Sequence, residues 1–284
     1  MRCRRVLDPP RVVSVRGEMK TAFASILALA LAVTVAEAGI SVQGGLARDL
    51  SLEPGATHWD VVVVANTGDE PALIRIYLTD YVFLADGSNY YDEPGTRERS
   101  CMSWVSVSPD RLEIPPQGEA RLALRIEIPD DADLTGVYWG MIMFEVEPDA
   151  PAVEPAVDQP SMSVRMVMRH ALQVSVSLPG GEAAVTLEGR LVPGDDTGVQ
   201  LEVDLASTGA ILIKPEIWTE FYDATGVLVE RIEGERRRLY PGCSTRHRFL
   251  LEGAAGMYSA LVVVDDGDRG VWGARYNLQI DETP

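Results

Sequence analysis

The chain has 284 residues, a formal net charge of −18, and a hydrophobic fraction of 46%. This length suggests two domains, and the mixture of apolar and charged residues indicates a globular protein and excludes a disordered one. The acidic excess argues against nucleic acid and anionic lipid as partners, because both repel negative charge at long range.

The first 38 residues are interpreted as a targeting segment that lies outside the fold. Residues 1–18 form an upstream extension before Met19, and an apolar run at 22–36 then leads into the small-residue motif at 36–38. This order is typical of a secretory signal, with cleavage predicted before Gly39. The run is short for a membrane span, and an uncleaved anchor is the alternative. We expect a periplasmic or secreted protein of the cell envelope, with no membrane attachment after cleavage.

Two cysteines remain after the signal segment, Cys101 and Cys243, one in each predicted domain. In an oxidising compartment they could pair across the domains, but two isolated thiols in separate cores are favoured.

Beyond residue 38, the chain has the pattern of short strands separated by turns. Residues 59–89 contain a strand, an Asn-Thr-Gly-Asp turn, an alternating strand and an Asp-Gly turn, and two further strand patterns follow at 112–129 and 136–147. Enrichment in Val, Ile, Leu and Tyr at this spacing predicts an all-β sandwich. No long segment has the apolar periodicity of a helix.

The second half repeats the order of the first. The turn motif at 207–209 has the same place in the second half as the turn motif at 66–68 has in the first. In each half a late strand begins with Gly-x-Tyr, which ends in Tyr138 in the first half and in Tyr258 in the second. Repeated signals in the same order predict two copies of one sandwich. The expected fold is therefore all-β, with two immunoglobulin-like β-sandwich domains in tandem, at 39–179 and 180–284.

A spacer at 147–160, rich in Pro, Ala and acidic residues, precedes a long alternating segment at 161–179. Its even positions are almost all apolar, and its odd positions are mostly Ser, Arg, Ala and Gln. We assign 161–178 to the first domain as its last strand, with a break or bulge expected near His170 because the segment exceeds an ordinary strand.

These patterns, at 61–78, 107–126, 136–145 and in the long last strand, resemble the periplasmic pilus-assembly chaperones. A looser resemblance links the chain to two-domain surface proteins that accompany peptidoglycan-bound WxL proteins. The resemblance implies that the last strand of the first domain adds to an incomplete subunit, and that basic residues bind the carboxyl terminus of that subunit. The partner-binding residues that it implies are Val164, Met166 and Met168 as donor residues, Arg165 or Arg169 as one basic anchor, and Arg48 as the other.

The residues themselves leave two interpretations open for this segment. Methionines at 162, 166 and 168 suit an adaptable protein-binding surface, or they fill a sandwich core. Arg165 and Arg169 either clamp a carboxylate or neutralise the acidic surface of the protein itself. The basic run at 236–238 is expected to pair within the molecule.

No pattern of catalytic or metal-binding residues is found. The three histidines, His58, His170 and His247, are isolated, and no nucleophile, phosphate-loop or dinucleotide motif is present. The acidic segment at 265–270 reads as a hairpin turn and not as a calcium loop. We therefore predict no cofactor, no metal and no enzymatic activity, with a sandwich-borne hydrolase as a remote alternative.

The leading hypothesis is a non-enzymatic exported protein that binds a protein partner through the edge strand at 161–170, as a chaperone or assembly factor for a surface structure. The alternative is a structural or adhesive envelope protein that binds cell-wall polymer or a surface protein. The oligomeric state stays open.

Overall fold

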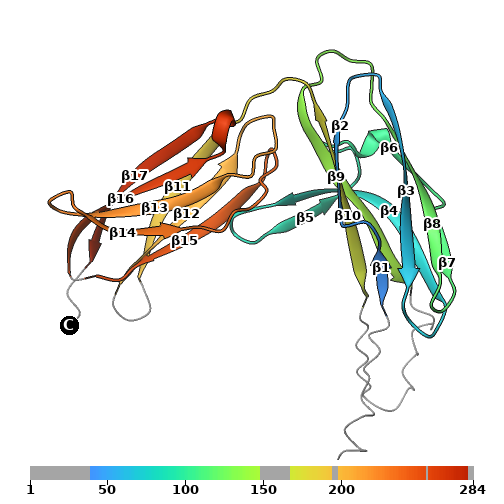
Figure 1. Cartoon of the computed structure of the whole chain (residues 1–284), viewed down its shortest axis with the longest axis horizontal. Helices are drawn as coiled ribbons and strands as arrows, with labels where there is room; N and C mark the ends of the chain where they lie inside the picture. Colours follow the sequence, from blue (N-terminus) through green and yellow to red (C-terminus); the bar gives the residue numbers. More distant parts are fainter. Residues whose placement is uncertain (1–38, 148–166, 194–197, 254, 281–284) are drawn as a thin grey trace, which may run out of the picture. The chain divides into compact units, whose positions relative to one another are not determined.

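The structure is a computed structural model, and it describes residues 39–147, 167–193, 198–253 and 255–280. Within these ranges the chain consists of strands β1 to β17 and two single-turn 3-10 helices, η1 (Met102–Trp104) and η2 (Gly267–Arg269). The strands build two sandwiches, one after the other in the sequence (Figure 1). The predicted all-β fold with two immunoglobulin-like sandwiches in tandem is confirmed.

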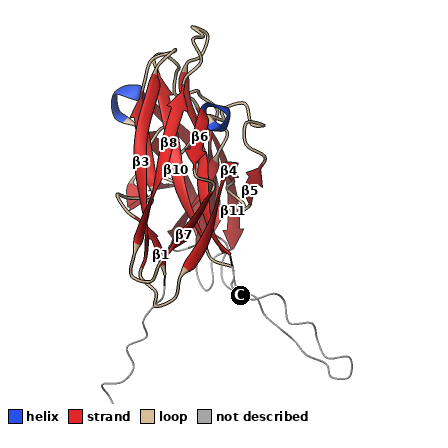
Figure 2. Cartoon of the chain, turned by 90° about the vertical axis from the view of Figure 1, so that its right-hand side faces the viewer, coloured by secondary structure: helices blue, strands red, loops and turns tan. Residues whose placement is uncertain are grey.

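The first sandwich has two sheets, whose strands run lengthwise in Figure 2. The smaller sheet has the order β1 (Ile40–Val42), β3 (Thr57–Asn66), β8 (Glu119–Glu127), β6 (Val105–Ser108). The larger sheet has the order β2 (Ala47–Ser51), β10 (Arg169–Leu178), β9 (Gly136–Glu147), β4 (Ala72–Phe83), β5 (Asn89–Asp92), and β7 (Arg111–Ile114) also pairs with β4.

The second sandwich also has two sheets. One has the order β11 (Val185–Pro193), β12 (Val199–Ser207), β15 (Ser244–Leu251), and the other β14 (Leu228–Glu233), β13 (Glu216–Asp223), β16 (Gly256–Asp265), β17 (Val271–Ile280). Strands β9 and β16 both begin with Gly-x-Tyr, and each is paired with the last strand of its sandwich. The repeated signals in the sequence thus mark equivalent strands.

The core between the sheets is formed by the apolar residues that alternate with polar ones along the strands. On β10, the side chains of Leu172, Val174 and Val176 are fully buried, while the odd-numbered residues point to the outer face. Burying each such side chain stabilises the fold by about 2 kcal/mol. A second core fills the other sandwich, and Trp139 of β9 joins it, because its ring stacks on Tyr240 at a centroid distance of 4.3 Å.

The predicted last strand of the first domain is shorter than 161–178. Strand β10 begins at Arg169 and pairs with β9 along its whole length. Residues 161–166 of the predicted strand lie outside the described residues.

Two smaller expectations are met. Residues 265–270 connect the antiparallel strands β16 and β17, so this segment is the expected hairpin turn. Cys101 and Cys243 are buried free thiols and form no disulfide. No helix in the described ranges is long and apolar enough to cross a membrane.

Candidate functional site: the open edge of β10

Half of the β10 edge has no neighbouring strand among the described residues. Strand β9 pairs with β10 from Arg169 to Leu178, whereas β2, on the other side, pairs in parallel only from Gln173 to Ser177. The segment 169–172 is therefore paired on one side and open on the other. Such an open side is a template on which another strand can add.

The hydrogen bonds identify which main-chain groups are open. The N–H of Val146 in β9 donates to the carbonyl of Met168 at 3.2 Å, and the N–H of Gln173 donates away from β9, to the carbonyl of Leu46, at 2.9 Å. In an antiparallel pair the direction of these groups alternates along the strand. The N–H and C=O groups of Arg169 and Ala171 therefore point to the open side, and no described residue bonds to them.

Apolar side chains are exposed around this edge. Leu46 is 54% exposed, Val167 41% and Met168 46%. Of the three predicted donor residues, Met168 lies within the described ranges, and it is next to the open main-chain groups of Arg169. Val164, Arg165 and Met166 lie outside the described residues, so their predicted roles stay predictions.

The edge is open because the first strand of the sandwich crosses between the sheets. Residues 40–42 pair with β3, the chain then turns through two glycines with positive φ, Gly44 and Gly45, and it reaches β10 only as β2. Arg48 holds this crossover: its Nε donates to Asp60 of β3 at 2.8 Å, and its Nη1 donates to the carbonyls of both glycines. The structure thus accounts for Arg48 by contacts within the sandwich.

The carboxyl group of Asp60 is held in its ionised form by this arrangement. Burial opposes ionisation, but the hydrogen bonds from Arg48 and from the N–H of Val61 outweigh it, so that the pKa of Asp60 is lowered.

The outer face of the sheet carries a row of charges at the open end of β10. Arg169, Glu145 and Arg75 are register partners across β10, β9 and β4. Glu145 accepts from Arg169 Nε at 2.6 Å, from Arg75 Nη2 at 3.0 Å, and from the Tyr77 hydroxyl at 3.2 Å. Burial opposes ionisation of Glu145, but the two guanidinium groups outweigh it and lower its pKa. Two cations thus share one carboxylate.

The other half of the β10 edge is closed and tied to the second sandwich. Asp49 of β2 accepts from the Ser175 hydroxyl at 2.7 Å and, through both oxygens, from Arg238 at 2.8 and 2.6 Å. A bidentate pair of this kind is among the stronger polar contacts, and it lowers the pKa of Asp49. Arg238 belongs to the basic run 236–238, and pairing within the molecule is found for all three residues of that run.

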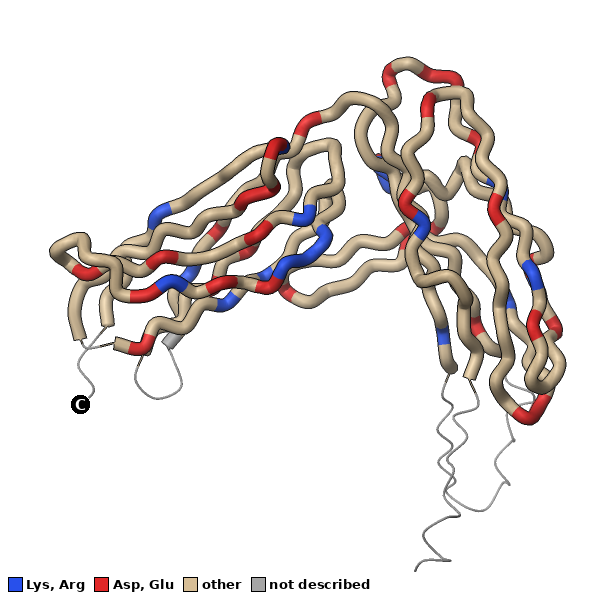
Figure 3. Tube along the Cα trace, in the orientation of Figure 1, with Lys and Arg blue, Asp and Glu red and all other residues tan. Residues whose placement is uncertain are grey.

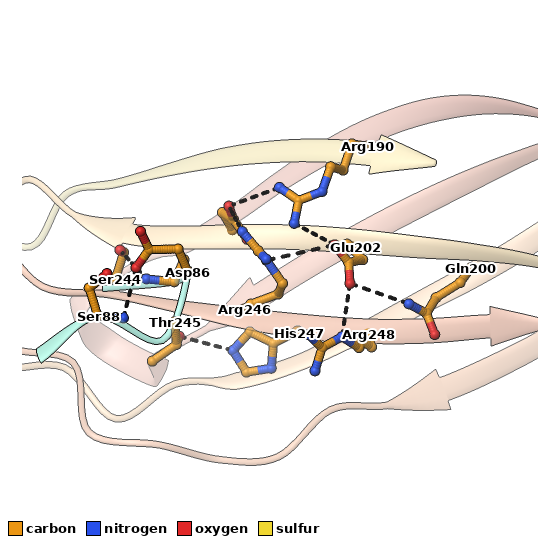
Figure 4. A network of polar contacts seen from close by, with 12 residues as sticks. Asp86, Ser88, Arg190, Gln200, Glu202, Ser244, Thr245, Arg246, His247 and Arg248 are labelled. Atoms are coloured by element: carbon orange, nitrogen blue, oxygen red, sulfur yellow. Dashed lines mark hydrogen bonds and ion pairs between the residues drawn. The ribbon is translucent and has the colours of Figure 1, made fainter. Parts of the chain in front are cut away.

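The acidic residues are spread over both sandwiches, as Figure 3 shows. The second sandwich carries a polar network on the outer face of β11, β12 and β15 (Figure 4). In it, Arg246 donates to both oxygens of Asp204 at 2.7 and 2.8 Å, and Glu202 accepts from Arg248 at 2.8 Å and from Arg190. These arginines are engaged by carboxylates of the same face, so we assign the network a structural role.

The chain therefore has two immunoglobulin-like sandwiches in tandem, and the last strand of the first sandwich is open along part of one edge. Comparison with solved structures finds similarity to fimbrial chaperones. The complex of a chaperone with a tip adhesin of CFA/I fimbriae matches with 14% identity, 84% of this chain and 98% of that chain covered, and a TM-score of 0.44.

Two further chaperone structures are similar at the same level. The class 5 fimbriae chaperone CfaA matches with 15% identity, 87% and 100% coverage and a TM-score of 0.41. The SafB chaperone of Salmonella enterica, in complex with the SafA pilin, matches with 12% identity, 84% and 96% coverage and a TM-score of 0.37. No protein-family model and no curated protein sequence matches the chain. The likeness is one of fold.

Several residues that shape the edge carry no local signal in the sequence. Asp49, Asp60 and Glu145 occupy strand positions at which an acidic residue is expected to be solvent-exposed, and each has an arginine partner on another strand. The glycine pair at 44–45 next to Arg48 is the one sequence feature that marks the crossover.

Proposed function

We propose that this protein is a non-enzymatic exported module that binds a protein partner by strand addition at the open edge of β10, as a chaperone or assembly factor. The observation that carries the proposal is the pair of residues Arg169 and Ala171, whose main-chain groups face away from β9 without a partner in the described residues. Main-chain bonds bind an added strand without demanding one sequence, and the exposed side chains of Val167 and Met168 provide apolar contact.

The substitution Ala171→Pro tests this proposal directly. Proline has no N–H, and at this position the missing donor is the one that faces the open side, so the ladder to β9 is preserved. The probe is a fluorescent strand-forming peptide of alternating valine and threonine with both ends blocked, and binding is followed by anisotropy. We expect Ala171→Pro to weaken binding about tenfold or more, through a lost bond and a steric clash.

The matched control is Ala171→Thr, which keeps the N–H and a strand-compatible side chain. Thermal unfolding establishes that both variants are folded. Equal binding by the proline and threonine variants, or no binding of the peptide to the wild-type protein, contradicts strand addition at this edge.

A second candidate function rests on a different surface. Trp59 on the outer face of β3 is 64% exposed, its neighbour Val61 is 54% exposed, and the guanidinium of Arg125 lies 5.1 Å from the indole centre. An exposed indole beside polar groups suits a sugar ring, which has apolar faces and a polar rim. The alternative is therefore a structural or adhesive protein that binds cell-wall polymer. Co-sedimentation with purified cell wall tests it: binding that Trp59→Ala abolishes and Ala171→Pro leaves intact favours this alternative.

A further inference from the structure

We infer that the partner strand carries an acidic side chain at the position that pairs with Arg169, on the outer face of the sheet. This inference rests on the proposed function, because it specifies the chemistry of the strand that adds to β10.

At the open end of β10, Arg169 shares its carboxylate partner with a second arginine. Arg169 and Arg75 share the single carboxylate of Glu145, and the adjacent Glu147 is paired with Arg111 at 3.2 Å. The group of Arg169, Glu145 and Arg75 therefore carries one net positive charge. In a chain with a net charge of −18, this is a local reversal of sign.

The uncompensated charge lies on the side where a strand would add. The side chain of Arg169 is 56% exposed, and only its Nε is bonded, so Nη1 and Nη2 have no partner among the described residues. Glu145 is held from its other side by Arg75. A further carboxylate can therefore reach Arg169 only from the open edge or from solvent.

The geometry of a sheet determines where the partner must carry its carboxylate. Paired residues of neighbouring strands point to the same face, in parallel and in antiparallel pairs alike, with Cβ atoms about 4.5–5.5 Å apart in an antiparallel pair. The residue paired with Arg169 therefore projects to the outer face, beside the free guanidinium nitrogens. An acidic residue there extends the row to four alternating charges: partner carboxylate, Arg169, Glu145, Arg75.

The proposed contact is to a side chain within the added strand, and it does not require the terminal carboxylate of the partner. Peptides with an amidated carboxyl terminus separate the two, because they have no terminal charge. At the neighbouring position, paired with Ala171, the register partners Met143 and Tyr77 carry no charge, and Arg169 is only a diagonal neighbour. The preference for an acidic residue is thus strongest at the site paired with Arg169.

The experiment uses the alternating valine and threonine peptide, with both ends blocked and glutamate, glutamine or lysine at one outward position near its centre. Each is titrated against wild-type protein at low salt. We expect the glutamate peptide to bind roughly fivefold more tightly than the lysine peptide, with glutamine between them, as for cross-strand charge pairs. In Arg169→Gln, which leaves Glu145 paired with Arg75, this preference should disappear.

The matched control is Arg111→Gln, which removes an exposed arginine of the same face, on β7, away from β10. It should keep the preference for glutamate. Equal binding of the three peptides to the wild-type protein, or an unchanged preference in Arg169→Gln, overturns the inference while strand addition itself stands. If no peptide binds the wild-type protein, the proposed function fails, and the inference fails with it.

Discussion

The contacts of Arg48 predict that this residue stabilises the first sandwich, and that it does not act on a partner. Its guanidinium bonds to Asp60 at 2.8 Å and to the carbonyls of Gly44 and Gly45, and its side chain is only 17% exposed. In Arg48→Ala, the partly buried carboxylate of Asp60 loses its counter-charge and the crossover loses its link to β3. The cost lies between that of an exposed ion pair, below about 1 kcal/mol, and that of a broken buried pair, about 3–5 kcal/mol.

We therefore expect Arg48→Ala to lower the free energy of unfolding by about 2 kcal/mol, measured by urea denaturation with circular dichroism. A double-mutant cycle with Asp60→Asn should give a coupling energy of about 1 kcal/mol, because the two groups bond directly. The control, Arg111→Ala, removes an arginine that is 62% exposed and should change the free energy by less than about 0.5 kcal/mol. If Arg48→Ala unfolds like the wild type but binds the strand peptide less tightly, the structural role is wrong, and Arg48 acts on the partner.

Three further predictions concern buried polar groups. Asp80 is 1% exposed and accepts hydrogen bonds from the backbone N–H groups of residues 95–97. Asp80→Ala should therefore lower the free energy of unfolding in urea by about 3 kcal/mol, and a decrease below about 1 kcal/mol would contradict this role. Burial lowers the pKa of His247 below its ordinary value of 6.5, so that the folded state favours the neutral ring. The free energy of unfolding should therefore have its full value above about pH 6.5 and decrease as the pH falls, and His247→Gln should make that decrease smaller. Burial raises the pKa of Cys243 to about 11 and also that of Cys101, so neither thiol should react with a disulfide reagent at about pH 8 until the protein is unfolded.

Much of the fold follows from short-range patterns in the sequence. The alternation at 172–178 predicted a strand with one buried face, and those even-numbered residues are in the core. The turn signals at 66–68 and 207–209 marked the ends of equivalent strands, since β3 ends at Asn66 and β12 at Ser207. Such patterns are readable because side-chain direction in a strand repeats every second residue.

The sequence pattern predicted an edge strand at 161–170, but it could not predict how far the open part of the edge extends. Its extent depends on where the chain switches from β1 to β2, and that switch is held by a contact between Arg48 and Asp60 in different sheets. The pattern of residue types also could not show that Arg169 shares Glu145 with Arg75, because these residues come from β10, β9 and β4. Long-range pairing of this kind is a property of the folded topology, and single-sequence patterns do not carry it.

The parallel pairing of β2 with β10 has a consequence for biosynthesis. The hydrogen bond between Asp49 and Ser175 joins positions 126 residues apart, so β2 leaves the ribosome long before its partner exists. Contacts of such large sequence separation form late and slowly. During synthesis the nascent first sandwich therefore passes through a stage in which β2 and β9 both expose unpaired backbone, and it is most prone to aggregate until residues 169–178 arrive.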